Sequence, residues 1–139
     1  MCIRDRCHVL LKVLCDAGYS VSLETGCGMD IAPVDERVSV ILDIKTPGSN
    51  EEKNMLWSNL AHLKSKDEMK FVLCGRSYYD WAKKKIIALN LVDKCPIVFS
   101  PSFNELKPID LAEWVLADQL PVRMQIQLHK ILWGEKAGV

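Results

Sequence analysis

Extended and helical segments alternate along this chain, and this alternation restricts the possible fold more than any other feature of the sequence. Strands are predicted at residues 19–24, 38–44, 70–74, 97–99 and 121–127, and helices at residues 8–17, 51–64, 78–90, 109–118 and 128–133. Ser77 is the expected N-cap of one helix, and Pro108 begins another from a favoured position. Strands separated by helices or long crossovers pair in parallel. The sequence therefore predicts an α/β fold with a mainly parallel sheet and flanking helices.

Two architectures satisfy this order of elements, an open sheet covered by helices on both faces and an arc of a (β/α) barrel. The continuous apolar run at residues 38–44 is typical of a strand that is covered on both faces. Both architectures place ligand-binding groups at the carboxyl ends of the strands. In this chain those ends carry carboxylates, amines, hydroxyls, an amide and an imidazole, so we expect a polar site along that edge of the sheet.

The composition limits the kinds of protein that this chain can be. Its 139 residues correspond to one ordinary domain, and 49% hydrophobic with 26% charged residues are typical of a soluble protein with a buried core. Lys and Arg number 18, as do Asp and Glu, so no net charge attracts nucleic acid or anionic membranes. No apolar run reaches the roughly 20 residues of a membrane span. We expect a cytoplasmic protein that contacts neither nucleic acid nor membrane directly.

Six cysteines are the unusual feature of the composition, at Cys2, Cys7, Cys15, Cys27, Cys74 and Cys95. No two of them are separated by the two residues typical of a zinc knuckle or a redox pair. A chain of this length can bury a core of its own without a disulfide framework. We therefore expect reduced thiols that pack as small apolar side chains.

Four side chains near the expected strand ends have properties suited to ligand binding. Glu24 and Asp43 can accept hydrogen bonds from a ribose or a heterocyclic amine. Lys45 lies two residues after Asp43, on the same face of an extended strand, and the two could bind a zwitterion such as an amino acid or form a structural ion pair. His129 suits either a bound carboxylate or a structural hydrogen bond. No GxGxxG or P-loop motif is present.

Four blocks of the sequence, at residues 23–26, 43–49, 99–102 and 120–133, resemble in order and spacing the 7-carboxy-7-deazaguanine synthases, a radical S-adenosylmethionine family. The last block, LPVRMQIQLHKILW, is the most specific of the four. The resemblance implies a modified, partial (β/α) barrel that is usually a homodimer. It also implies a lyase reaction that converts 6-carboxy-5,6,7,8-tetrahydropterin into 7-carboxy-7-deazaguanine with loss of ammonia, in the biosynthesis of queuosine and other deazapurines.

The cofactors that the resemblance implies are S-adenosylmethionine, a 4Fe–4S cluster and Mg²⁺, with flavodoxin or ferredoxin as the reductant. The residues that match the family's cofactor-binding strand ends and loop are Glu24, Thr25, Asp43, Lys45, Ser100, Pro101, Ser102 and Phe103. Gln127 and His129 match the family's C-terminal Gln-x-His-Lys pattern, whose histidine lies at the pterin substrate. The resemblance identifies no catalytic residue and no metal ligand in this chain.

Several motifs of the family are absent from this sequence. The three-cysteine cluster motif, the substrate-binding Gln-Gly-Glu segment, the Mg²⁺-binding threonine and the Gly-Gly-Glu-Pro cofactor motif have no counterpart. Residues 7–139 are therefore expected to be the C-terminal part of one radical S-adenosylmethionine domain, inactive when isolated. Residues 1–6 resemble translated sequencing-adapter sequence and are expected to be non-native. The alternative function is a non-catalytic α/β binding or interaction module that uses the same edge of the sheet for a small anionic ligand.

Overall fold

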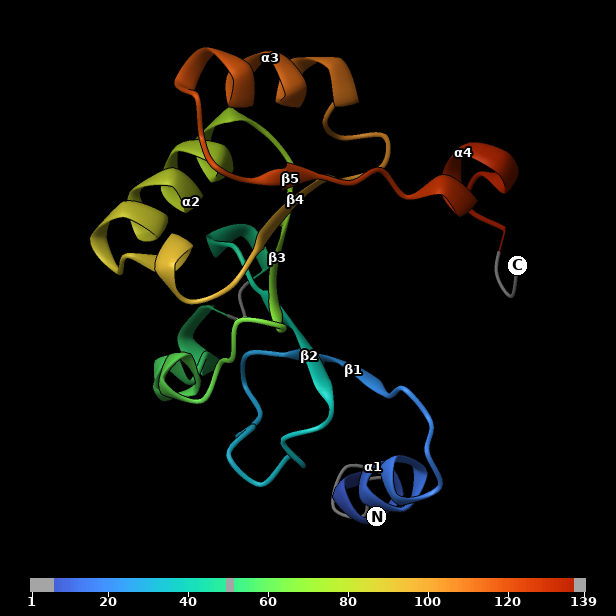
Figure 1. Ribbon diagram of the computed structural model, residues 1–139. Helices are drawn as coiled ribbons and strands as arrows, with labels where there is room; N and C mark the ends of the chain where they lie inside the picture. Colours follow the sequence, from blue (N-terminus) through green and yellow to red (C-terminus); the bar gives the residue numbers. More distant parts are fainter. Residues whose placement is uncertain (1–6, 50–51, 137–139) are drawn as a thin grey trace.

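Five parallel strands, hydrogen-bonded in chain order, form the sheet of this computed structural model, which describes residues 7–49 and 52–136 (Figure 1). The strands are β1 (Ser22–Gly26), β2 (Ser39–Ile44), β3 (Glu68–Leu73), β4 (Ile97–Pro101) and β5 (Arg123–Met124). Every neighbouring pair is parallel. The predicted α/β fold with a parallel sheet is confirmed. Residues 1–6, expected to be non-native, lie outside the described residues.

Helices lie in the connections from β2 to β3, from β3 to β4 and from β4 to β5, whereas β1 is joined to β2 by turns and irregular chain. The α-helices are α1 (Cys7–Asp16), α2 (Arg76–Ala88), α3 (Pro108–Asp118) and α4 (Leu128–Trp133). Short 3-10 helices form at η2 (Pro47–Ser49), η3 (Glu52–Asn54), η4 (Trp57–Ala61) and η5 (Leu91–Asp93). Pro108 is the first residue of α3, as predicted. No helix in the described part of the chain is long and apolar enough to cross a membrane.

The main hydrophobic core lies on one face of the sheet. Alternate residues of β2 and β3 are buried, and they pack with buried residues of α2 and α3. The rings of Phe71 and Phe99 meet edge to face with centroids 5.6 Å apart, and Tyr79 of α2 meets Phe99 in the same way at 5.9 Å. A smaller cluster anchors α1 to the sheet through its buried residues Leu11 and Cys15. The expected packing of thiols as apolar side chains is confirmed for Cys15 and for two others, Cys27 and Cys95.

The opposite face of the sheet, called the open face below, carries most of the polar strand residues. On β1, β2 and β3 it comprises Ser22, Glu24, Ser39, Ile41, Asp43, Glu68, Lys70 and Val72. These side chains are half-buried or exposed, whereas their neighbours on the core face of β2 and β3 are buried. Within residues 7–49 and 52–136, helices therefore cover only one face of residues 38–44, and the expectation that both faces are covered was wrong. Coverage on one face is consistent with an arc of a (β/α) barrel rather than a doubly wound sheet.

The helix expected at residues 51–64 is wrong, because η3 and η4 occupy this segment and no α-helix forms among its described residues. The buried amide of Asn59 donates to the carbonyls of Cys27 at 3.2 Å and Met29 at 2.7 Å, and its Oδ1 accepts the Ile31 N–H at 3.2 Å. The Leu56 N–H donates to the Cys27 carbonyl at 2.8 Å. These bonds to the segment after β1 replace the i to i−4 bonds of an α-helix.

Two predicted boundaries also change. Ser77 does not cap α2, because that helix begins at Arg76 with Gly75 at the N-cap and no side-chain cap bond. The last strand was expected over residues 121–127, yet it consists of Arg123 and Met124 alone. After it, the Gln125 N–H still donates to the Phe99 carbonyl at 2.9 Å, and the chain then turns into α4.

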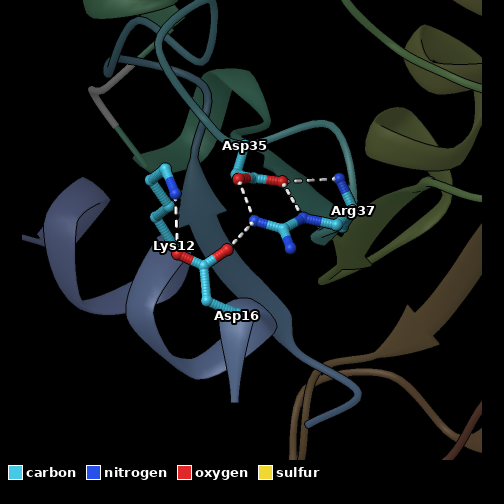
Figure 2. Close-up of polar contacts among 4 residues, drawn as sticks. All are labelled: Lys12, Asp16, Asp35 and Arg37. Carbon is cyan, nitrogen blue, oxygen red and sulfur yellow. Dashed lines mark hydrogen bonds and ion pairs between the residues drawn. The ribbon is translucent and has the colours of Figure 1, made fainter. Parts of the chain in front are cut away.

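Ion pairs fasten α1 to the turn that precedes β2 (Figure 2). The Arg37 guanidinium donates to Asp16 of α1 at 2.7 Å and to Asp35 at 2.8 and 2.9 Å, while Lys12 donates to Asp16 at 2.6 Å. Hydrogen bonds from Lys12 and Arg37 hold the pKa of Asp16 below its usual value. Hydrogen bonds from Arg37 likewise lower the pKa of Asp35. The network is solvent-exposed, so we expect its contribution to stability to be small and salt-dependent.

Substitution of Arg37 tests this network through the pH dependence of stability. The folded state holds both aspartate pKa values below those of the unfolded chain, which are about 3.9. The network therefore stabilises the fold above about pH 4, and this contribution is lost as the pH falls through the folded-state pKa values. We expect Arg37→Gln to lower the urea midpoint at pH 7 and to lower it by a smaller amount at pH 3, where part of the contribution has already been lost. Lys84→Gln, which removes one exposed positive charge from α2, should leave the midpoint unchanged at both pH values.

Candidate functional site

The carboxyl ends of all five strands lie at one edge of the sheet, because every strand runs in the same direction. In register, Gly26 of β1 is paired with Asp43 of β2, which is paired with Lys70 of β3. Polar residues near the ends of β1 and β2 are thus neighbours on the open face. The structure confirms that the carboxyl ends of β1 and β2 bring polar residues to one edge of the sheet, as the sequence predicts.

Two ion pairs lie on the open face near these strand ends. The Lys45 ammonium contacts the Asp43 carboxylate, which is the pairing considered for these residues from sequence. The Lys70 Nζ lies 2.9 Å from Oε1 of Glu24. Lys70 was missed in the sequence reasoning, although its alternation with the buried residues Met69 and Phe71 marks it as a charged group on the opposite face. The four groups carry no net charge together.

A first cavity, of about 630 Å³, opens beside the end of β1. Three expected cofactor-binding residues, Glu24, Thr25 and Lys45, line it. Its wall also includes Cys27 and Met29, whose carbonyls accept the Asn59 amide. The volume lies in the range of small-molecule sites, roughly 300–1,000 Å³. The cavity is therefore large enough for a ligand of nucleoside size, and Glu24, Thr25 and Lys45 are its polar neighbours at the strand ends.

The loop after β2, residues 45–49, is held against α2 at a point where only glycine fits. A Cβ atom added to Gly48 would lie 2.7 Å from Cζ of Tyr78, which is closer than real Cβ contacts. The Tyr78 ring thus packs directly on the Gly48 backbone. This contact restricts the position of the chain that follows Lys45.

A second cavity, of about 400 Å³, lies between the loop after β4 and the start of α4. It brings together Pro101, Ser102, Phe103 and Gln127, four residues expected at the cofactor or substrate. Ser102 is fixed from two sides, because its N–H donates to the Leu73 carbonyl at 2.8 Å and its hydroxyl contacts the carboxylate of Glu105.

Glu105 is a lining residue that the sequence reasoning did not identify. Hydrogen bonds from the Ser102 hydroxyl, and then from the Cys74 thiol, lower the pKa of Glu105. Burial, followed by the Glu105 carboxylate, raises the pKa of Cys74. Cys74 is therefore a neutral hydrogen-bond donor at neutral pH rather than a reactive thiolate. Only the fold reveals this cluster, since Cys74 follows β3 and the other two residues follow β4.

Three expected site residues line neither cavity. Asp43 is connected to the first cavity indirectly, because it forms an ion pair with Lys45, which lines that cavity. Ser100 is fully buried on β4, and its hydroxyl has no hydrogen-bond partner within the described structure. His129 is exposed on α4, which stands apart from α1, α2 and α3 (Figure 1). Throughout residues 7–49 and 52–136, no group of three or more His, Cys, Asp or Glu side chains is arranged to hold a metal ion.

Three curated proteins named 7-carboxy-7-deazaguanine synthase are similar to most of this chain. The protein from Chlorobaculum tepidum is 42% identical over 131 residues, which cover 92% of this chain and 60% of the relative. The protein from Koribacter versatilis is 36% identical over 143 residues, covering 93% and 63%. The protein from Clostridium acetobutylicum is 35% identical over 131 residues, covering 93% and 57%.

This chain therefore spans about 60% of the length of the curated relatives that it matches. No family model matches the chain, and no solved structure matches it. The similarities confirm the resemblance that the four sequence blocks indicated, and they extend it to about nine-tenths of this chain.

Proposed function

We propose that this chain, a homologue of the 7-carboxy-7-deazaguanine synthases, is the C-terminal part of such an enzyme. The complete enzyme is a radical S-adenosylmethionine lyase that converts 6-carboxy-5,6,7,8-tetrahydropterin into 7-carboxy-7-deazaguanine with loss of ammonia. The observation that carries this proposal is 42% identity across 92% of the chain. The cavities at the strand ends support it, because open parallel sheets and barrel arcs bind ligands at this edge.

S-adenosylmethionine binds at the first cavity and the neighbouring strand ends in this proposal. Glu24 accepts hydrogen bonds from ribose hydroxyls, while Asp43 and Lys45 present opposite charges that complement an amino-acid group. The bound cofactor supplies a carbon-centred radical for hydrogen-atom abstraction. The residues of this chain orient the cofactor and exclude water from it.

The pterin substrate lies toward the second cavity, near the start of α4. Gln127 presents an amide that donates and accepts hydrogen bonds, which suits the mixed donors and acceptors of a pterin ring. Ser102 and Phe103 lie on the opposite wall, on the loop that follows β4. His129 is proposed to approach the substrate from α4.

The described residues do not fit an iron–sulfur cluster or Mg²⁺, since they contain no suitable set of ligands. The sequence also lacks the three-cysteine motif of the family. The proposal is that this chain binds ligands but is inactive by itself. In the complete enzyme we expect a homodimer in the cytoplasm that receives electrons from flavodoxin or ferredoxin.

Calorimetric titration of the chain with S-adenosylmethionine tests this function. We expect saturable binding, and we expect Lys45→Met to weaken it by about tenfold because a hydrogen bond to a charged group is lost. Lys84→Met, on the exposed surface of α2, should bind as the unsubstituted chain does. The same samples, incubated with iron, sulfide and a reductant, should not cleave S-adenosylmethionine. Absence of binding would refute the cofactor site, and cleavage would refute the inactivity of the isolated chain.

A further inference from the structure

Lys70 reaches across a whole strand to contact Glu24. It lies on β3, and Glu24 lies on β1, with β2 between them. Even so, the Lys70 Nζ is 2.9 Å from Oε1 of Glu24. The Lys70 side chain is 21% exposed and that of Glu24 is 60% exposed, so the lysine is the more enclosed partner.

The register makes this pairing selective. Asp43 is the direct neighbour of Lys70 in the adjoining strand, yet the ion pair of Asp43 is with Lys45. Each lysine thus pairs with a different carboxylate: Lys45 with Asp43, and Lys70 with Glu24. Without Lys70, Glu24 and Asp43 would both depend on the single ammonium of Lys45. The Glu24 side chain would then be free to change its rotamer or to displace Asp43.

Of the two residues in the Lys70–Glu24 ion pair, one borders the first cavity. Glu24 lines that cavity, whereas Lys70 does not. Lys70 donates to one oxygen of Glu24, which leaves the carboxylate other acceptor positions for a ligand. Exposed ion pairs contribute little to the stability of a fold, so this contact has little value for stability alone. Its geometric consequence is larger, because it holds the carboxylate of Glu24, whose side chain is 60% exposed, in one position beside the strand ends.

We propose that Lys70 is a positioning residue of the S-adenosylmethionine site, fixing Glu24 so that its free acceptor positions meet the ribose hydroxyls of the cofactor. This inference rests on the proposed function. Lys70 acts through Glu24 and does not touch the ligand. The expected signature is therefore non-additivity between the two residues in ligand affinity.

The test is a double-mutant cycle in the full chain, with S-adenosylmethionine affinity measured by calorimetry. We expect Lys70→Met and Glu24→Gln each to weaken binding by about tenfold, as for loss of a charge-assisted hydrogen bond. The double variant should bind no more weakly than Glu24→Gln alone. Lys70→Arg should retain most of the affinity, since it keeps a cation at the same place. Lys84→Met is the control for loss of a lysine distant from the site.

Thermal melting of each variant distinguishes a loss of affinity caused by misplacement of Glu24 from one caused by unfolding. We expect the melting midpoint of each variant to be close to that of the unsubstituted chain. If Lys70→Met does not fold, Lys70→Gln replaces it under the same expectation. Binding by Lys70→Met equal to that of the unsubstituted chain overturns the inference and leaves the cofactor site standing, provided that Glu24→Gln weakens binding. Additive losses of about a hundredfold in the double variant also overturn it, because Lys70 would then act on the ligand independently. No binding by the unsubstituted chain refutes the proposed function itself.

Discussion

Asn59→Ala should lower the free energy of unfolding by about 2–4 kcal/mol and should also abolish measurable ligand binding at the first cavity. The substitution removes the bond from Asn59 to the Met29 carbonyl and leaves the Ile31 N–H without the Asn59 oxygen that it donates to, and an unsatisfied buried group costs about 1–3 kcal/mol. The Cys27 carbonyl keeps its bond from Leu56. Because Cys27, Met29 and Ile31 all line the cavity, loss of the Asn59 bonds releases its wall.

Urea denaturation measures the change in stability, and calorimetry with S-adenosylmethionine measures the change in binding. Ser58→Ala is the matched control, since Ser58 is the exposed neighbour of Asn59 within η4. We expect its effect on stability to stay within about 0.5 kcal/mol. An Asn59→Ala variant as stable as the control would show that the amide does not hold the segment after β1.

Phe71→Ala should have the larger effect on stability, lowering the free energy of unfolding by about 3–5 kcal/mol. Phe71 is fully buried at the centre of the sheet, and its ring meets that of Phe99 edge to face. Removing it leaves a void that the surrounding strands can fill only in part. Since native domains are stable by about 5–15 kcal/mol, this variant should be close to unfolding at room temperature.

Ile87→Ala provides the comparison for Phe71→Ala. Ile87 is also a large apolar residue, but it is 66% exposed on α2. Its truncation should change the stability by less than about 0.5 kcal/mol. Equal losses in the two variants, seen in urea titrations followed by circular dichroism, would contradict the assignment of the core to the Phe71 face of the sheet.

Part of the candidate site follows from the sequence. Glu24, Thr25 and Lys45 were expected together from their places at strand ends, and the structure brings all three to the first cavity. Lys70 and Glu105 were not expected, because their relation to the site depends on register and on loop packing. A charged residue within a strand indicates a polar face, but it does not identify a partner two strands away.

Local sequence by itself determined the parallel α/β fold and the start of α3 at Pro108, because the periodicity of apolar residues and the fixed φ of proline act over a few residues. Only the tertiary structure decided that residues 52–54 and 57–61 form short 3-10 helices instead of one α-helix, since the bonds of Asn59 to a segment about 30 residues away outweigh helical preference. The tertiary structure also decided which face of the sheet the helices cover and which carboxylate forms an ion pair with Lys70. Those outcomes depend on long-range packing and hydrogen bonding, whose partners are set by the assembled sheet.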